Sequence, residues 1–131
     1  MISIIIPIYN GVQHIQQCLA AIEQQTYVEY EVIIIENGSV DGTWEYLQKY
    51  QANPKIQLFQ SEITGLGNAC NLGLEKAKGK YITFVDVDDY IYPNYLEELA
   101  KYKKYKVVKA GVEGDTNSFS LENGEQQRID F

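Results

Sequence analysis

The sequence has few of the residues that form disulfides and zinc sites, with two cysteines and one histidine among its 131 residues. Cys18 and Cys70 lie in segments with helical periodicity, and a chain with enough apolar residues for a core does not need a disulfide framework. We therefore expect reduced thiols, as in a cytoplasmic protein. His14 has no second histidine with which to share a metal ion, so we predict that it is a surface residue.

A surplus of positive charge is also missing, because the chain has 11 basic and 18 acidic residues and a net charge of −7. Nucleic acid requires a clustered basic surface, so it is excluded as the main partner. An anionic ligand would instead need a bridging cation. The opening segment MISIIIPIYN lacks the basic region of a signal peptide and the ~20 apolar residues of a membrane span. We predict that this segment is a first strand.

The apolar pattern alternates between short β-branched runs and longer segments with helical spacing. Near-continuous apolarity is typical of parallel strands that are covered on both faces. Strands that alternate with helices indicate an α/β fold, with a mostly parallel, Rossmann-like sheet flanked by helices. The length suits one domain, which we place at residues 1–131. The expected strands are 2–6, 31–35, 56–59, 81–85 and 107–112, and the expected helices are 12–25, 41–50, 65–78 and a segment after Pro93.

The segment YITFVDVDD at 81–89 ends an expected buried strand with three carboxylates, at Asp86, Asp88 and Asp89. In open α/β sheets, ligands bind at the carboxyl ends of the strands. Three like charges this close together repel one another unless water or a cation neutralises them. Mg²⁺ and Mn²⁺ prefer oxygen ligands, so we predict that one of these ions binds here.

Polar residues also follow the second expected strand, where Glu36 and Asn37 come directly after a run of isoleucines. These side chains are expected at the same edge of the sheet as the three aspartates. In the helix that follows, Asp41 is a candidate cap. We expect Trp44 and Leu47 to be buried contacts of that helix.

The helix expected at 65–78 begins with Gly65-Leu66-Gly67. This segment is not a dinucleotide-binding motif, because Cys70 occupies the position of the third glycine. Its small residues instead allow a ligand or a neighbouring helix to approach the backbone closely. We expect one apolar face of the helix to be buried, consisting of Leu66, Ala69, Cys70, Leu74 and Ala77.

A basic cluster with interleaved tyrosines follows the last expected helix. One interpretation is a solvated helix end, whose lysines complement the helix dipole. The alternative is peripheral contact with anionic lipid headgroups at a membrane surface or with a partner. The lysines are Lys101, Lys103, Lys104, Lys106 and Lys109.

Four segments occur in an order that resembles the nucleotide-sugar-binding half of a GT-A-fold, family 2 inverting glycosyltransferase. They are ISIIIPIYN, EVIIIENGSVDGT, GLGNACNLGLEKAKGKYITFVDVDD and YPNYLEEL. The resemblance covers residues 2–99. It implies transfer of a sugar from a nucleoside-diphosphate donor to the hydroxyl of a glycan or lipid-linked acceptor, in glycan or polysaccharide synthesis. It also implies a cytoplasmic protein or one at the inner face of the membrane, and the oligomeric state stays open.

The resemblance assigns roles to individual residues. Pro7 and Tyr9 would line the base pocket, and Glu36 and Asn37 would stand where the family usually has two aspartates that contact base and ribose. The D-x-D motif falls on Asp86 and Asp88. Asp88 would bind Mn²⁺ or Mg²⁺ directly, and Asp86 would face the ribose or the waters of the metal. Gly65 and Asn68 are further candidates for donor contacts.

Two residues depart from the family pattern. Asn37 replaces the commoner aspartate, and because an amide donates as well as accepts hydrogen bonds, specificity for uracil is in doubt. Cys70 stands where the family often has an arginine, which removes a cation that would pair with phosphate. Asn68 is an alternative source of a polar contact there. We expect Cys70 to be a small, buried structural residue.

The acceptor half of the family fold has no counterpart in the sequence. Residues 1–112 form the expected donor-binding core, and Asn123-Gly124 within 113–131 predicts a hairpin. We assign no catalytic base. The alternative function is therefore a nucleotide-sugar-binding module or fragment without catalysis. A nucleotidyltransferase is disfavoured, because its glycine- and lysine-rich phosphate loop near the first strand is absent.

Overall fold

A computed structural model of the chain describes residues 1–102, 107–108, 119–122 and 125–128. The chain divides into two compact units. The first consists of residues 1–23 and 28–91, and the second of residues 24–27 and 92–131. Each unit is described separately below. The sequence-based assignment of one domain to residues 1–131 stays a prediction.

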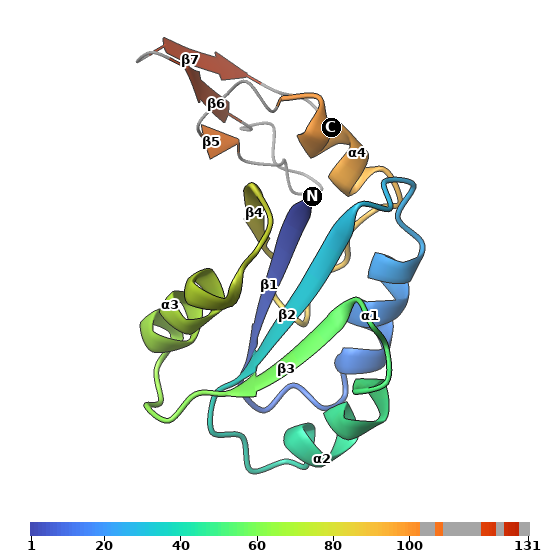
Figure 1. Ribbon diagram of the computed structural model, residues 1–131, viewed down its shortest axis with the longest axis vertical. Coiled ribbons are helices and arrows are strands. Elements are labelled where there is room, and N and C mark those ends of the chain that lie inside the picture. The colour runs from blue at the N-terminus through green and yellow to red at the C-terminus, as the bar shows by residue number, and fades with distance from the viewer. Residues whose placement is uncertain (103–106, 109–118, 123–124, 129–131) are drawn as a thin grey trace. The chain divides into compact units, whose positions relative to one another are not determined.

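The first unit is built on a parallel sheet with the strand order β3-β2-β1-β4 (Figure 1). All three pairings are parallel, so the carboxyl ends of the four strands meet at one edge. The predicted α/β class and each of the first four strands are confirmed. The strands are β1 (Ile2–Ile8), β2 (Tyr30–Glu36), β3 (Ile56–Gln60) and β4 (Tyr81–Phe84).

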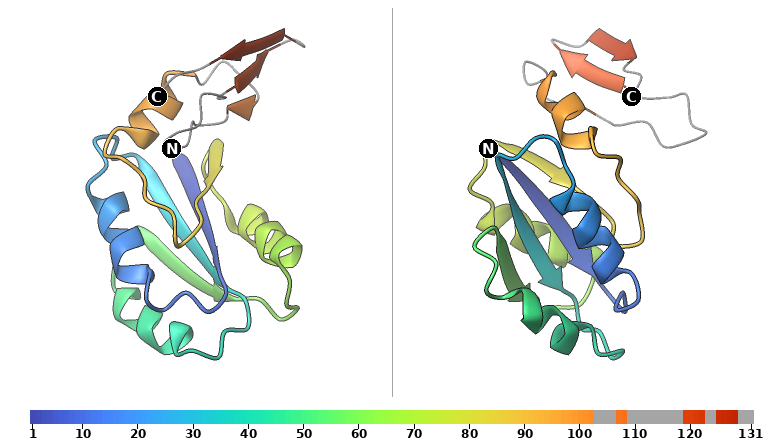
Figure 2. Two further views of the ribbon diagram at one scale, coloured as in Figure 1. Left: turned by 180° about the vertical axis from the view of Figure 1, so that it is seen from behind. Right: turned by 90° about the vertical axis from the view of Figure 1, so that its right-hand side faces the viewer.

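Helices cover both faces of this sheet, with α1 and α2 on one side and α3 on the other (Figure 2). The helices exist where the sequence predicts them but are shorter by up to three residues at an end, because their first and last turns are irregular. In the second predicted helix a five-residue α-helix continues as a 3₁₀ turn. The bounds are α1 (Ile15–Glu23), α2 (Thr43–Leu47), η1 (Gln48–Tyr50) and α3 (Leu66–Lys76).

The core lies on the two central strands, whose isoleucines alternate between the faces. On the α3 side, Ile5, Ile33 and Ile35 pack with Ala69, and all four are fully buried. The helix comes so close to β1 that a Cβ on Gly73 would lie 2.4 Å from Ile5 Cγ2. A small residue in this helix therefore serves helix-to-sheet packing. On the opposite face the buried residues include Ile4, Ile6, Ile34, Ile15, Leu19 and Ile22.

The expectation that β4 is covered on both faces is wrong. Ile82 is 41% exposed and Phe84 is 45% exposed, because β4 is the edge strand of the described sheet and α3 packs over β1 and β2. The predicted apolar face of α3 is wrong in part for the same reason. Ala69 is buried, whereas Leu66 and Leu74 are exposed on the part of the helix that no described strand covers.

The two residues of α2 that were expected to be buried differ in their exposure to solvent. Leu47 is fully buried, as predicted, but Trp44 is only half-buried. The helix is a single short segment before the 3₁₀ turn, so one narrow face meets the sheet and the indole stays partly in solvent.

The second unit contains helix α4 (Tyr95–Ala100) and a small antiparallel sheet of β5 (Val107–Val108), β6 (Phe119–Glu122) and β7 (Glu125–Arg128). Gln25 ties its two segments together, since its Oε1 accepts a hydrogen bond from the Leu96 amide and its Nε2 donates to the Tyr92 carbonyl. Strands β6 and β7 pair antiparallel, whereas Asn123-Gly124, on which the hairpin prediction depends, lie outside the described residues. Val107 and Val108 pair antiparallel with β6, although the sequence pattern suggested a further strand of the parallel series. None of the helices in the described part of the chain is long and apolar enough to cross a bilayer.

Candidate functional site

A cavity of about 250 Å³ opens at the carboxyl edge of the parallel sheet, between the loops that follow β1 and β4. It lies where open α/β sheets bind ligands. The structure brings four sequence-predicted residues together here, Pro7, Tyr9, Asp86 and Asp88. The other lining residues, which the sequence did not indicate, are Asn10, Gly11, His14 and Val87.

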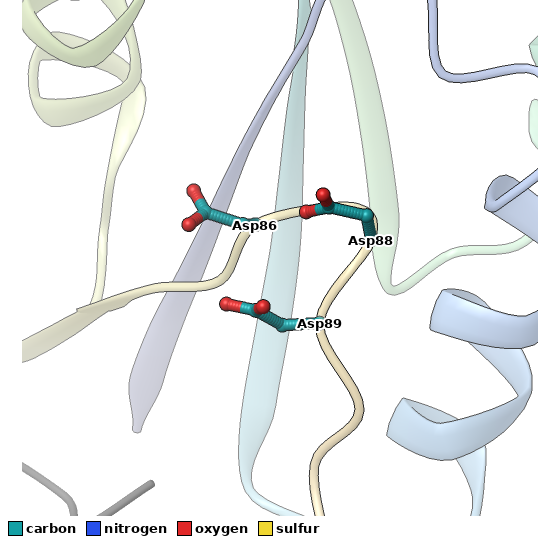
Figure 3. Close-up of side chains that lie close together, drawn as sticks. All are labelled: Asp86, Asp88 and Asp89. Carbon is teal, nitrogen blue, oxygen red and sulfur yellow. The ribbon is translucent and has the colours of Figure 1, made fainter.

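Three carboxylates converge beside this cavity (Figure 3). Asp88 and Asp89 project toward Asp86, and one ligand atom from each residue lies within 4.8 Å of the others. Across residues 1–102, no lysine or arginine forms an ion pair with any of them. Burial and the neighbouring Asp86 and Asp88 charges raise the pKa of Asp89. The group is therefore an uncompensated set of oxygen donors, which fits a hard divalent cation such as Mg²⁺ or Mn²⁺.

Close backbone approach shapes the wall between the two loops. A Cβ on Gly11 would lie 2.8 Å from Val87 Cγ1 and 2.9 Å from Ile8 Cγ2, so only glycine fits. Val87 stands between the two aspartates of the D-x-D segment. The loop after β1 and the acidic loop after β4 therefore form one packed structure.

The polar residues at the end of β2, Glu36 and the following Asn37, are both buried. Glu36 accepts a hydrogen bond from the Ser39 amide, and the Asn37 amide continues the strand pairing by donating to the Ile8 carbonyl at 2.8 Å. The side-chain Oδ1 of Asn37 is buried and has no hydrogen-bond partner among the described residues. A buried hydrogen-bond acceptor without a partner lowers the stability of the fold unless a ligand or a water molecule supplies a donor.

Four of the predicted site residues, Glu36, Asn37, Gly65 and Asn68, lie outside the cavity lining. Gly65 precedes α3 with a φ of 123°, and the Asn68 side chain donates to the Thr64 carbonyl at 3.2 Å. His14, expected on the surface, is half-buried and lines the cavity. Its position one turn into the segment after Asn10-Gly11 is the signal that would have indicated this.

Both cysteines are free thiols, as predicted. Burial, together with Asp89 and Asp88, raises the pKa of Cys18 to about 11. Burial and Asp86 also raise the pKa of Cys70, which is partly buried. Thiols with raised pKa values are poor nucleophiles at neutral pH, so neither cysteine is suited to thiol chemistry.

Of the basic cluster, Lys101 is described, and its ammonium lies 2.7 Å from Glu98 Oε1 in the last turn of α4. This ion pair raises the pKa of Lys101. Lys103, Lys104, Lys106 and Lys109 lie outside the described residues.

The parallel sheet with an acidic loop after its edge strand β4 agrees with the GT-A fold that the sequence resemblance implies. The model of the family "Glycosyl transferase family 2" matches residues 3–117. The chain therefore belongs to glycosyl transferase family 2, in agreement with the resemblance in its sequence. A curated relative, "Glycosyltransferase GlyA" of Streptococcus pneumoniae serotype 4, is 35% identical over 125 residues, which is 94% of this chain.

Solved structures share the fold. S. aureus TarS 1-349 in complex with UDP-GlcNAc has a TM-score of 0.73 and 30% identity, over 86% of this chain and 35% of that chain. The mannosyltransferase PcManGT from Pyrobaculum calidifontis, in complex with GDP-Man and Mn²⁺, has a TM-score of 0.75 at 24% identity, over 85% of this chain and 35% of that one. The present chain spans 18% of the length of GlyA.

Proposed function

We propose that this chain binds a nucleoside-diphosphate sugar with the help of a divalent cation and forms the donor half of an inverting glycosyltransferase. The observation that carries the proposal is the set of three carboxylates within 4.8 Å of one another, at a cavity lined by Pro7 and Tyr9. A bound cation would neutralise a diphosphate, which this acidic edge could not bind alone. Binding of UDP-GlcNAc by TarS and of GDP-Man with Mn²⁺ by PcManGT supports the same class of donor.

Each side chain has a proposed role. Asp88 holds the metal ion directly, and Asp86 faces the ribose or the waters of the metal. Pro7 and the exposed ring of Tyr9 line the base pocket. Glu36 organises the loop after β2 through its bond to the Ser39 amide. Gly65 and Asn68, at the start of α3, remain candidates for contacts farther along the donor.

Asn37 is the proposed reader of the base. Its Oδ1 has no partner among the described residues but is buried outside the cavity lining, so it would accept a hydrogen bond from an N–H group of the ligand once donor binding uncovers it. Uracil, thymine and guanine carry such a ring N–H, and the amide nitrogen of Asn37 supplies a donor that an aspartate lacks. The asparagine is therefore compatible with UDP, dTDP and GDP donors.

The second candidate function is a nucleotide-sugar-binding module without catalysis. The chain covers about a third of the TarS and PcManGT chains and less of GlyA, so sugar transfer by these residues alone is itself part of the proposal. No residue is proposed as catalytic base. The acceptor hydroxyl, the glycan or lipid that carries it, a cytoplasmic location and contact of the lysine cluster with anionic lipid all remain parts of the proposal.

The test is calorimetric titration of the purified chain with UDP, GDP and dTDP, in Mn²⁺ and in excess chelator. We expect one of the three nucleotides to bind in the presence of Mn²⁺ and none to bind in excess chelator. Asp88→Asn should weaken that binding at least about tenfold, a loss of ~1.4 kcal/mol in binding free energy. Glu75→Gln is the matched control, because it removes one negative charge from an exposed position of α3. Equal affinity of Asp88→Asn and wild type would refute the metal role, and transfer of sugar by the chain alone would refute the non-catalytic alternative.

A further inference from the structure

The loops that follow β1 and β2 are joined by hydrogen bonds centred on Asp41 and Thr43. Asp41 Oδ2 accepts from the Val12 amide at 3.2 Å, and its Oδ1 accepts from the Thr43 amide at 3.1 Å and from the Thr43 hydroxyl. Thr43 Oγ1 in turn accepts from the Gly11 amide at 3.2 Å. Two consecutive amides of the loop after β1 are thus bonded to side chains some 30 residues away in the sequence.

A second pair of bonds joins the same two loops. The Asn10 amide donates to Ser39 Oγ, and Asn10 Oδ1 accepts from the Val40 amide, both at 2.8 Å. Asn10 has a φ of 51°, a left-handed conformation that asparagine adopts more readily than most residues. Residues 10–12 are therefore bonded one after another to the loop after β2.

This hydrogen-bonded loop contacts the metal-binding segment. Gly11 lies against Val87, and a Cβ on Gly11 would lie only 2.8 Å from Val87 Cγ1. Val87 separates Asp86 from Asp88, and all of these residues line the cavity. A continuous path of contacts thus leads from Asp41 through Thr43, Gly11 and Val87 to the two aspartates.

We propose that Asp41 and Thr43 are positioning residues of the donor site, which hold the Gly11 and Val12 amides so that the loop after β1 packs against the metal-binding segment. The proposal rests on the proposed function, because it assigns these residues a role in nucleotide binding. Thr43 is 1% exposed and does not line the cavity, so it acts through Gly11. A helix cap alone would require the bonds within residues 41–43 but not those to Gly11 and Val12.

The test compares two substitutions of one side chain. Thr43→Val keeps the shape and removes the hydroxyl, whereas Thr43→Ser keeps the hydroxyl and removes the methyl group. In titrations with UDP, GDP and dTDP in Mn²⁺, we expect Thr43→Val to bind the recognised nucleotide about three- to tenfold more weakly than wild type, and Thr43→Ser to bind it nearly as well. Hydrogen exchange without nucleotide provides a second measurement, in which the Gly11 amide should exchange faster in Thr43→Val.

Thr26→Val is the control for a general loss of stability. Thr26 lies in the second unit, where its hydroxyl donates to the Pro93 carbonyl and to Glu97, so its removal should lower the melting temperature without changing nucleotide affinity. Equal affinity of Thr43→Val and wild type would overturn the inference alone. Equal weakening by Thr43→Ser would also overturn it, because packing and not the hydroxyl would then matter. A wild-type chain that binds none of UDP, GDP and dTDP would refute the proposed function and the inference with it.

Discussion

Gly73→Ala tests how closely α3 packs on the central strand. Gly73 is buried in the helix, and an added Cβ would lie 2.4 Å from Ile5 Cγ2, 3.3 Å from Cδ1 and 3.4 Å from Cγ1. Real Cβ atoms almost never approach another heavy atom to within 3.0 Å. Ile5 is fully buried in β1 and has no space into which to move, so the helix itself must shift away from the sheet.

Two opposing terms determine the magnitude. Alanine is about 1 kcal/mol better than glycine inside a helix, whereas an extra methyl group in a packed core costs about 1–3 kcal/mol. Because the contact of 2.4 Å with Ile5 Cγ2 is far shorter than 3.0 Å, the cost of the extra methyl group should lie in the upper part of its range. We expect a net loss of about 1–2 kcal/mol, which for a chain of this size lowers the melting temperature by roughly 3–10 °C.

Gly67→Ala provides the matched control, since it lies in the same helix and an added Cβ there has no neighbour within 4 Å. It should be as stable as wild type or more stable by up to about 1 kcal/mol. Thermal and urea unfolding followed by circular dichroism measure both variants. A Gly73→Ala variant as stable as Gly67→Ala would refute the close packing of α3 against Ile5.

Three further predictions concern titratable groups. Hydrogen bonds from the Thr43 hydroxyl and from the Val12 and Thr43 amides lower the pKa of Asp41, so the stability that its ionised form contributes should be lost as the pH falls. Asp41→Asn should therefore melt below wild type at pH 7 and converge with it below about pH 4, and a constant gap would contradict this. The pKa of Asp89 shifts in the opposite direction, because burial and the Asp86 and Asp88 charges raise it, so its ionised form lowers stability. Asp89→Asn should melt higher than wild type at pH 7 without metal, and an unchanged or lower melting temperature would exclude charge repulsion at the cluster. Cys18, buried and with its pKa raised to about 11, should resist iodoacetamide at pH 7.5 until urea unfolds the chain, whereas labelling at the rate of a free thiol would show that it is accessible.

The sequence by itself determined the order and type of the elements and the location of the acidic site. Runs of β-branched residues such as Ile4 to Ile6 and Ile33 to Ile35 form strands because their side chains suit an extended, buried backbone. Asp86 and Asp88 follow such a strand directly, so their place at the carboxyl edge required only the rule that parallel strands end together. Both inferences depend on neighbouring residues along the chain.

Burial of particular side chains needed the tertiary structure. The apolar runs of β4 and α3 have the composition of covered elements, yet Ile82, Phe84, Leu66 and Leu74 are exposed. A periodic pattern shows which face of an element is apolar but not whether another element lies against it. Glu31 gives the converse case, since it is buried and accepts hydrogen bonds from the Ser3 hydroxyl and from the amides of Lys78 and Gly79.

The connections between loops were likewise decided only by the tertiary structure. Nothing in the sequence near Gly11 indicates that its amide donates to Thr43 or that its Cα lies against Val87. These contacts join residues more than 30 positions apart and arise because three parallel strands deliver their loops to one edge of the sheet. Local propensity specifies each loop separately, and the folded sheet then sets the distances among the loops. The position of the aspartates could therefore be predicted from the sequence, whereas the contacts that hold their loop in place could not.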